Sequence, residues 1–206
     1  MIKKIETIGL AMGWFAIITQ FFLMLQNRQT GLFEMTIRFF SFFTILTNIL
    51  VALYFTVAVF KLKIIPLKWL ASKGTLTAIT AFILIVGLVY QIALRAIWNP
   101  TGLQYIVDEL LHTIIPLFML GYWAFMIKKE DLRVKPVVNW LLYPLFYMAF
   151  IMVRGYLSGY YPYPFLNVNE IGYEKAFINI SIIFGTVLGI LISLLLIGKA
   201  IVKKKN

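Results

Sequence analysis

The sequence predicts an all-α integral membrane protein with six membrane-spanning helices in a single domain, residues 1–206. Its 206 residues are 62% hydrophobic and 13% charged, and the mean hydropathy is +0.90. No soluble domain of this size has such a composition. A membrane span needs about 20 apolar residues, and six stretches qualify. We expect the spans at residues 7–26, 37–60, 76–97, 104–127, 137–157 and 176–198.

The first two apolar runs have different sequence features. The first run follows the short basic segment Met1–Lys4 and lacks a convincing small-residue cleavage site. We therefore interpret it as an uncleaved span rather than a signal peptide. Gly9 and Gly13, four residues apart, favour close packing of this run against another helix. The second run starts with polar residues between Arg38 and Asn48, and its remaining half is mostly apolar.

A short turn joins the third and fourth runs. The third run ends with Gln91 and Arg95, and the segment Trp98–Gly102 contains Asn-Pro and a glycine. These residues are typical of tight turns. The fourth run then opens with two acids, Asp108 and Glu109. We expect the turn to bring Arg95 toward both acids, where an ion pair would make the site rigid.

An aromatic, proline-rich segment joins the last two runs. The fifth run ends at Arg154, and Tyr160–Phe165 mixes tyrosine and proline before the sixth run. Proline restricts the backbone and aromatic rings favour the membrane interface, so we expect this segment to form a stiff cap. In the sixth run, the four-residue spacing of Gly185 and Gly189 favours close helix packing.

The basic residues predict the orientation of the bundle. The net charge of +11 comes from lysines and arginines that gather at one set of loops and at both ends of the chain. They are Lys3, Lys4, Lys61, Lys63, Lys68, Lys73, Lys128, Lys129, Arg133, Lys135, Lys199, Lys203, Lys204 and Lys205. Basic loops stay in the cytoplasm, so we predict that both termini are cytoplasmic. We expect the protein in a cytoplasmic membrane.

In this orientation, most polar residues inside the runs fall in the outer half of the membrane. They include Thr19, Gln20, Ser41, Thr44, Thr47, Asn48, Gln91, Asp108, Glu109, His112, Asn179 and Ser181. We therefore expect a polar cavity in the outer leaflet, closed below by apolar packing.

Several classes of protein and of site are excluded by the composition. The basic residues lie in loops rather than on one soluble face, which argues against nucleic acid as a partner. The chain has no cysteine, which excludes disulfides and thiolate chemistry. A single histidine excludes a bis-histidine haem within one chain, and it leaves Glu109-x-x-His112 as only half of a di-iron motif. We therefore expect no metal and no cofactor.

His112, the only histidine, is the strongest candidate for a catalytic group. On a helix, Asp108 and Glu109 share its face. Pro116 offers no N–H to the His112 carbonyl, so we expect a kink there. A hydroxyl nucleophile such as Thr44 needs a base, commonly an imidazole oriented by a carboxylate. The alternative is a structural histidine bonded to a neighbouring helix, with Thr44 bonded to its own backbone.

Five further residues are candidates for substrate contact. Arg38, Arg95 and Arg154 would form an outer ring that binds a carboxylate or phosphate group. Alternatively, these arginines extend to the membrane interface without a ligand. Asn48 is a candidate for holding an oxyanion, and Gln91 lies in the same outer half.

Four strings together resemble the bacterial six-span membrane proteins of the Pr-six-Pr family. They are Phe39–Asn48, Leu94–Gly102, Asp108–Pro116, and Arg154-Gly155 with Pro162–Phe165. The resemblance covers nearly the whole chain. Members of that family are in turn distantly similar to the eukaryotic androgen-induced and androgen-dependent TFPI-regulating membrane proteins.

The resemblance implies an intramembrane threonine hydrolase that cleaves fatty acid esters of hydroxy fatty acids. Such enzymes use one threonine and one histidine. His112, in His-Thr-x-x-Pro, is similar to the family histidine. The family threonine follows an aromatic–apolar pair, which matches Thr44 in Phe42–Thr44. Thr47 is the competing match, because the spacing to the following Asn48 differs from the relatives' pattern by about a residue.

Hydrolysis of a membrane lipid ester is therefore the leading functional hypothesis. Thr44 or Thr47 would attack the ester, His112 would act as the base, and Asp108 or Glu109 would orient it. One alternative is a small transporter or lipid-binding protein that uses the same polar cavity. Another is a subunit that packs with partners and has no chemistry. Transport requires access from both sides of the membrane, which the apolar inner halves do not favour.

Overall fold

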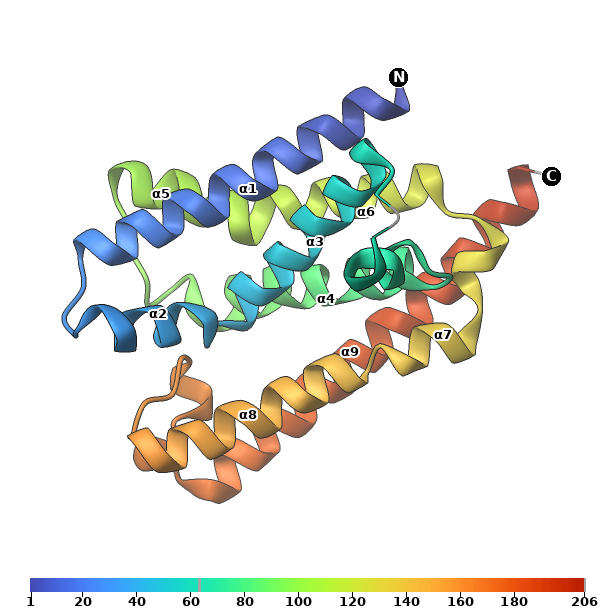
Figure 1. Cartoon of the computed structure of the whole chain (residues 1–206). Coiled ribbons are helices and arrows are strands. Elements are labelled where there is room, and N and C mark those ends of the chain that lie inside the picture. The colour runs from blue at the N-terminus through green and yellow to red at the C-terminus, as the bar shows by residue number, and fades with distance from the viewer. Residues whose placement is uncertain (63, 206) are drawn as a thin grey trace.

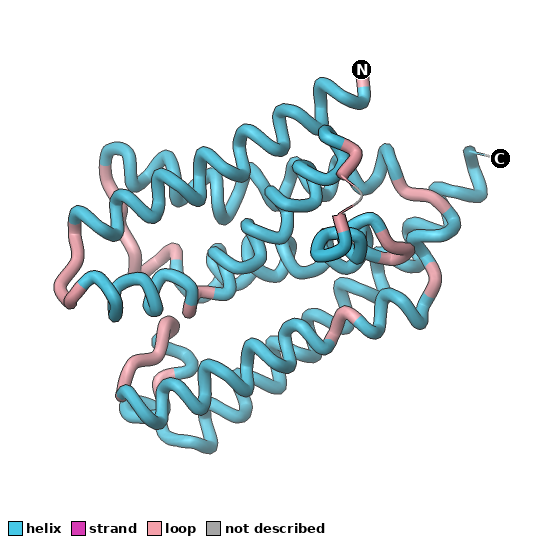
Figure 2. Tube along the Cα trace, viewed as in Figure 1, coloured by secondary structure: helices cyan, strands magenta, loops and turns pink. Residues whose placement is uncertain are grey.

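The computed structural model describes residues 1–62 and 64–205, and within these residues it contains helices and no strands (Figures 1 and 2). Lys63, one of the basic residues used to predict the orientation, lies outside the described residues. The helices are α1 (Ile2–Gln26), α2 (Leu32–Phe40), α3 (Phe43–Phe60), α4 (Thr75–Val89), α5 (Gly102–Glu109), α6 (Ile115–Met126), α7 (Val134–Asn139), α8 (Leu142–Ser158) and α9 (Val168–Lys205). Five shorter helical segments are η1 (Ile65–Ala71), η2 (Tyr90–Leu94), η3 (Leu110–Ile114), η4 (Lys129–Leu132) and η5 (Pro164–Leu166).

Six helical segments are long and apolar enough to cross a membrane, which confirms the prediction of an all-α chain with six long apolar helices. They are Ile2–Gln26, Phe43–Phe60, Thr75–Leu94, Gly102–Met126, Val134–Ser158 and Val168–Lys205. This is the organisation of an integral, multi-pass membrane protein.

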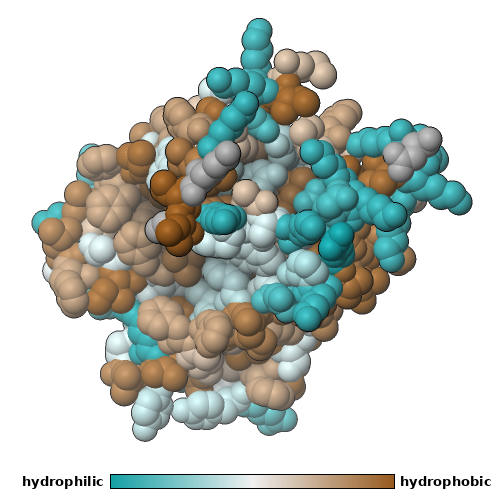
Figure 3. Space-filling view, turned by 45° about the vertical axis from the view of Figure 1, so that its right-hand side comes forward, coloured by the Kyte–Doolittle hydropathy of each residue, from teal (hydrophilic) through white to brown (hydrophobic). Residues whose placement is uncertain are grey.

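Both termini lie at the same end of the bundle (Figure 1). We call it the terminal end and the opposite one the site end. The ammonium group of Lys205 donates hydrogen bonds to the carbonyls of Ala124 and Phe125, which ties the tail to the end of α6. Hydrophilic side chains gather toward the terminal end in Figure 3, whereas the flanks are mostly hydrophobic. This distribution is the one expected of a bundle whose sides face lipid.

Helix α4 is the most enclosed of the six apolar segments, and it packs against α3, α6 and α9. At the terminal end, the Thr77 hydroxyl donates to the Asp131 carbonyl (2.8 Å) and accepts from the Trp123 indole (3.2 Å). Fully buried Phe55 and Phe82 lie in the same core as Trp123. Large side chains therefore fill the interior between the helices.

The two glycine pairs differ in their packing. A Cβ on Gly13 would lie 3.2 Å from the Ala52 Cα, so α1 and α3 approach closely there, as small residues in a membrane helix allow. Gly185 and Gly189 have no neighbouring atom within 4 Å of a Cβ position. The close packing predicted for this pair is wrong, because its face of α9 is exposed rather than turned toward another helix.

The second predicted span, 37–60, is broken into two helices. Helix α2 ends at Phe40 and α3 begins at Phe43, so Arg38 belongs to α2 and not to a span. The Ser41 hydroxyl bonds the Ile37 carbonyl (2.7 Å), which competes with continuation of the helix. The fifth apolar segment is likewise interrupted between α7 and α8.

Pro116 lies in the first turn of α6, directly after the π-helical segment η3, so the backbone before the proline is an irregular, wide helical turn. The end of the third apolar segment has a second π-helical turn, η2. Single π turns inside α-helices occur frequently at functional sites.

Candidate functional site

A cavity of about 610 Å³ opens at the site end of the bundle. Parts of α1, α2, α3, η2, α5 and η3 form its walls, and residues from Tyr160 to Pro164 cover it. We call it the site cavity. Its polar lining includes Arg38, Thr44, Tyr90, Asp108, His112 and Tyr163. Thr44 and His112, which the sequence proposes as a catalytic pair, therefore line the same cavity.

Thr44 is the second residue of α3, a position created by the break after α2. The first N–H groups of a helix have no partner within it. In α3, the Thr44 N–H donates to the Tyr163 hydroxyl (3.3 Å), and that hydroxyl also lies 3.4 Å from the Thr44 Oγ1. Tyr147 secures the other side of the break, since its hydroxyl donates to the Ser41 carbonyl (2.9 Å).

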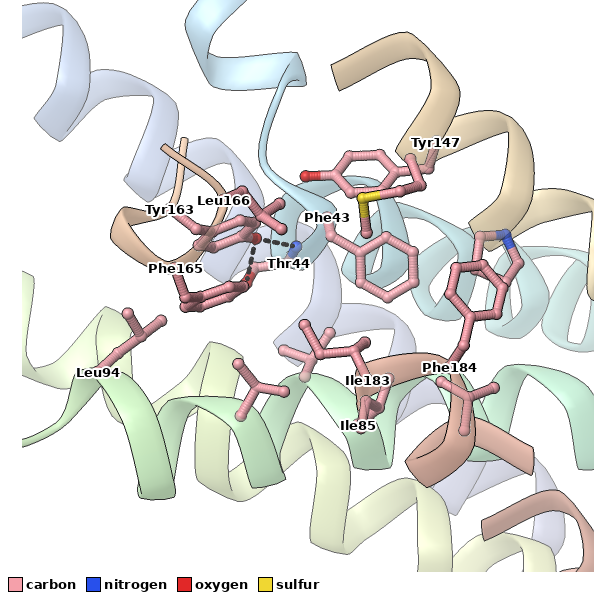
Figure 4. Close-up of a pocket in the computed structure, with 15 residues that line it drawn as sticks. Phe43, Thr44, Ile85, Leu94, Tyr147, Tyr163, Phe165, Leu166, Ile183 and Phe184 are labelled. Carbon is pink, nitrogen blue, oxygen red and sulfur yellow. Dashed lines mark hydrogen bonds between the residues drawn. The ribbon is translucent and has the colours of Figure 1, made fainter. Parts of the chain in front are cut away.

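Thr44 also borders a second, apolar cavity of about 60 Å³, which we call the apolar slot (Figure 4). Side chains of α4, α8 and α9 form its walls, among them Ile85, Met148 and Ile183. Tyr163 and Leu94 line both cavities. The Thr44 hydroxyl thus lies between a cavity with charged groups and a slot that is almost entirely hydrocarbon.

His112 lies in the π turn η3, with its ring fixed from two directions. Its Nδ1 is 3.0 Å from the Asp108 carbonyl oxygen and 3.3 Å from the Asp108 Oδ1. The ring stacks on Tyr90 with centroids 4.1 Å apart and planes 11° apart. Because Nδ1 faces two oxygens, it carries the proton, and Nε2 is left as an acceptor without a partner in the described residues.

Asn48 joins the two halves of the site. Its amide nitrogen donates to the Thr44 carbonyl (2.9 Å) and to the Leu111 carbonyl (3.3 Å), next to His112. Asn48 is completely buried and lines neither cavity. Its donors are occupied by backbone, so in this structure the amide connects α3 to η3.

Thr47, the competing nucleophile, is completely buried and lines neither cavity. Its hydroxyl lies 2.9 Å from the Tyr143 hydroxyl. Thr44 and Thr47 are three residues apart on one helix, yet only Thr44 shares a cavity with His112.

Arg95, Gln91 and Glu109 form a network outside the site cavity. Arg95 donates to the Gln91 side-chain oxygen (2.8 Å) and pairs with the Glu109 carboxylate. Gln91 in turn donates to the Thr113 hydroxyl (3.0 Å). Of the two acids, therefore, Asp108 contacts His112 and Glu109 contacts Arg95.

Arg38 and Arg154 both contact the Glu34 carboxylate and the Tyr160 ring. Glu34 accepts from Arg38 (2.7 Å) and from Arg154 (2.8 Å) through the same oxygen, and both guanidinium groups lie over the Tyr160 ring. Hydrogen bonding to Arg38, with the positive charge of Arg154, lowers the pKa of the Glu34 carboxyl. Two cations face one anion, so the cluster keeps a net positive charge where Arg38 meets the cavity.

Sequence reasoning missed Tyr90 and Tyr163 as members of the site. Tyr90 lies beside Gln91 at the end of the third run, and no pattern there distinguishes a stacking partner for a histidine. Tyr163 belongs to the Tyr160–Phe165 segment, interpreted only as a cap. Its Pro-Tyr-Pro pattern could have indicated a side chain held rigidly over the bundle.

No group of three histidine, aspartate or glutamate side chains that could bind a metal ion occurs among residues 1–62 and 64–205.

Glu34 predicts a pH dependence of stability. Because its pKa is lowered in the folded chain, the unfolded chain binds more protons as the solution is acidified. The Glu34 contribution to the free energy of unfolding is complete above the ordinary pKa of 4.5 and is lost as the pH falls through the lowered value. Glu34→Gln should therefore lower the melting temperature in detergent, by an amount that shrinks on acidification below about pH 4.5.

Glu170→Gln is the matched control, since Glu170 is exposed and has no ion pair in the described residues. A difference between wild type and Glu34→Gln that stays constant from about pH 6 to about pH 3 would contradict this linkage.

Comparison with known proteins gives no match: no family model, curated protein or solved structure matches the chain. The resemblance to the Pr-six-Pr family stays a prediction, and the function has to be inferred from the chemistry of the site.

Proposed function

We propose that this protein is an intramembrane hydrolase of lipid esters with Thr44 as its nucleophile and His112 as its general base. The observation that carries the proposal is that Thr44 and His112, from separate spans, line one cavity while Thr44 also borders the apolar slot. An ester with an acyl chain needs both environments, because its carbonyl must meet polar groups while its chain stays in hydrocarbon.

The arrangement of His112 supports its role as a base. With the proton on Nδ1 held by Asp108, Nε2 is free to accept the Thr44 proton. Asp108 is 5% exposed, and its carboxylate lies 3.3 Å from Nδ1 of His112. A carboxylate buried in an apolar bundle is costly, and such groups persist where a site uses them.

The reaction would proceed in two halves. Thr44 attacks the ester carbonyl, His112 takes the hydroxyl proton, and the same proton is returned to the leaving alcohol. Water then cleaves the acyl-threonine, with His112 again as the base. Thr44 and His112 share no hydrogen bond in the structure, which is common where catalytic contacts tighten only around the substrate.

Substrate binding would divide between the two cavities. The apolar slot would hold the start of the acyl chain next to Thr44, and Arg38 would hold a carboxylate on the other part of the substrate. Fatty acid esters of hydroxy fatty acids have this form. Arg154 would assist through the shared Glu34 and Tyr160 contacts. Arg95 and Gln91 lie outside the site cavity and would act only indirectly.

The orientation follows from the basic residues near the terminal end. We propose that the terminal end is cytoplasmic, which puts the site in the outer half of a bacterial cytoplasmic membrane. Acyl chains would enter from lipid, and water would reach the site cavity from outside.

A transporter or lipid-binding protein with the same cavity is the alternative. Transport requires a second opening at the terminal end, where Phe55, Phe82 and Trp123 are buried and fill the core. This packing favours chemistry at one face over passage through the bundle.

The test compares Thr44→Ala, Thr47→Ala and His112→Ala with wild type in detergent, using a panel of lipid esters and a fluorophosphonate probe. We expect Thr44→Ala to abolish labelling and turnover and His112→Ala to reduce kcat by about 10²-fold or more, because each removes a reacting group. Thr47→Ala should stay active, since the Thr47 hydroxyl bonds to Tyr143 and lines neither cavity. Turnover that survives in folded Thr44→Ala would contradict the proposal that Thr44 is the nucleophile.

The two acids provide a second test. Asp108→Asn should lower kcat, because it removes the carboxylate that stabilises the protonated imidazole. The loss should be smaller than that of His112→Ala, since the Asp108 backbone carbonyl still orients Nδ1. The matched variant Glu109→Gln, which alters only the Arg95 pair, should change kcat less than Asp108→Asn. The reverse order of the two effects in a steady-state assay would exclude Asp108 as the orienting group.

A further inference from the structure

Tyr163 is the side chain that contacts the Thr44 hydroxyl directly. It comes from the segment over the site cavity, and its hydroxyl is within 3.3 Å of the Thr44 N–H and 3.4 Å of Oγ1 (Figure 4). Its ring stacks on Phe165 with centroids 5.1 Å apart and meets the edge of Phe42 at 5.8 Å. Aromatic contacts on two sides therefore hold the phenol at the junction of the two cavities.

The phenol also keeps its proton for donation. Burial raises the pKa of Tyr163 above its ordinary value, so the side chain is neutral at physiological pH. Its oxygen accepts from the Thr44 N–H, and its O–H lies within hydrogen-bond distance of Oγ1, where either hydroxyl can be the donor.

Neighbouring donors are already engaged. Both hydrogen bonds of the Asn48 amide nitrogen go to backbone carbonyls, and the Tyr147 hydroxyl donates to Ser41. The Tyr143 hydroxyl is paired with Thr47. Among these groups, Tyr163 is the one whose hydroxyl lies within hydrogen-bond distance of the Thr44 Oγ1.

We propose that Tyr163 is a catalytic residue that donates a hydrogen bond to the oxyanion formed when Thr44 attacks the ester. This inference rests on the proposed hydrolase function. As the Thr44 Oγ1–carbon bond forms, the carbonyl π electrons move to the carbonyl oxygen and the Thr44 proton moves to His112. The oxyanion and Oγ1 are then bonded to one carbon, so a hydroxyl 3.4 Å from Oγ1 can reach the oxyanion.

Collapse of the intermediate returns the electron pair to the carbonyl, and the leaving alkoxide takes the proton from His112. Tyr163 gives up no proton in either half of the reaction. The start of α3 adds to the stabilisation, because the N-terminus of a helix favours negative charge. The hydroxyl would therefore act on the transition state more than on the bound substrate.

Tyr163→Phe tests the assignment, since it removes only the hydroxyl. Activity is measured on a long-chain p-nitrophenyl ester, with melting temperature as the check on folding. We expect kcat to fall by about 10²-fold to 10³-fold, as for loss of one oxyanion donor, with little change in KM. Binding of an alkyl trifluoromethyl ketone, whose threonine adduct carries the oxyanion, should weaken by the factor by which kcat/KM falls.

Tyr143→Phe is the matched control, because it deletes a half-buried hydroxyl that bonds to Thr47 on the same helix, and Tyr143 lines neither cavity. It should keep kcat within a fewfold of wild type. An equal loss of kcat in both variants, or a kcat near wild type in Tyr163→Phe, overturns the assignment. If Thr44→Ala is inactive, either of these results contradicts the role of Tyr163 but not the proposed hydrolase function. Wild-type protein that neither reacts with a fluorophosphonate nor cleaves any ester contradicts both proposals.

Discussion

The break between α2 and α3 is the constraint on which the site depends. In a continuous helix the Thr44 N–H would bond to a carbonyl one turn earlier, and its side chain would have no special environment. Because the chain leaves the helix at Ser41 and re-enters it at Phe43, a carbonyl and a set of N–H groups lose their partners. Tyr147 satisfies the carbonyl and Tyr163 satisfies the N–H of Thr44. In an apolar environment such groups are costly when unpaired, so the two tyrosines stabilise the break.

The backbone around His112 is also irregular, but for a different reason. The wide turn η3 precedes Pro116, which has no N–H, and it carries His112. A Cβ on Gly87 would lie 2.9 Å from the His112 carbonyl, so α4 can approach this turn closely only with glycine there. Asn48 then bonds to both backbones and fixes the distance between the two irregular segments. Local departures from regular helix therefore position the proposed nucleophile, Thr44, and the proposed base, His112.

Sequence patterns predict the six long apolar helices because hydropathy and length act locally. They also nominate Thr44, His112 and Asp108, since rare polar residues in apolar runs are easily recognised. They do not predict the break after Phe40 or the roles of the two tyrosines. No glycine or proline marks that break, and its stabilising partners, Tyr147 and Tyr163, lie more than a hundred residues away. Contacts of this kind depend on tertiary packing, which a single sequence does not reveal.

The most direct test of the proposed site is to find which residue reacts covalently. Purified protein would be treated with an alkyl fluorophosphonate and digested, and the modified peptide sequenced by mass spectrometry. We predict a single adduct on Thr44, because among the serine and threonine side chains of the described residues Thr44 alone lines both cavities, one of which it shares with His112. An adduct on Thr47, which is buried against Tyr143, or on any other hydroxyl while Thr44 stays unmodified, would contradict the assignment of the site.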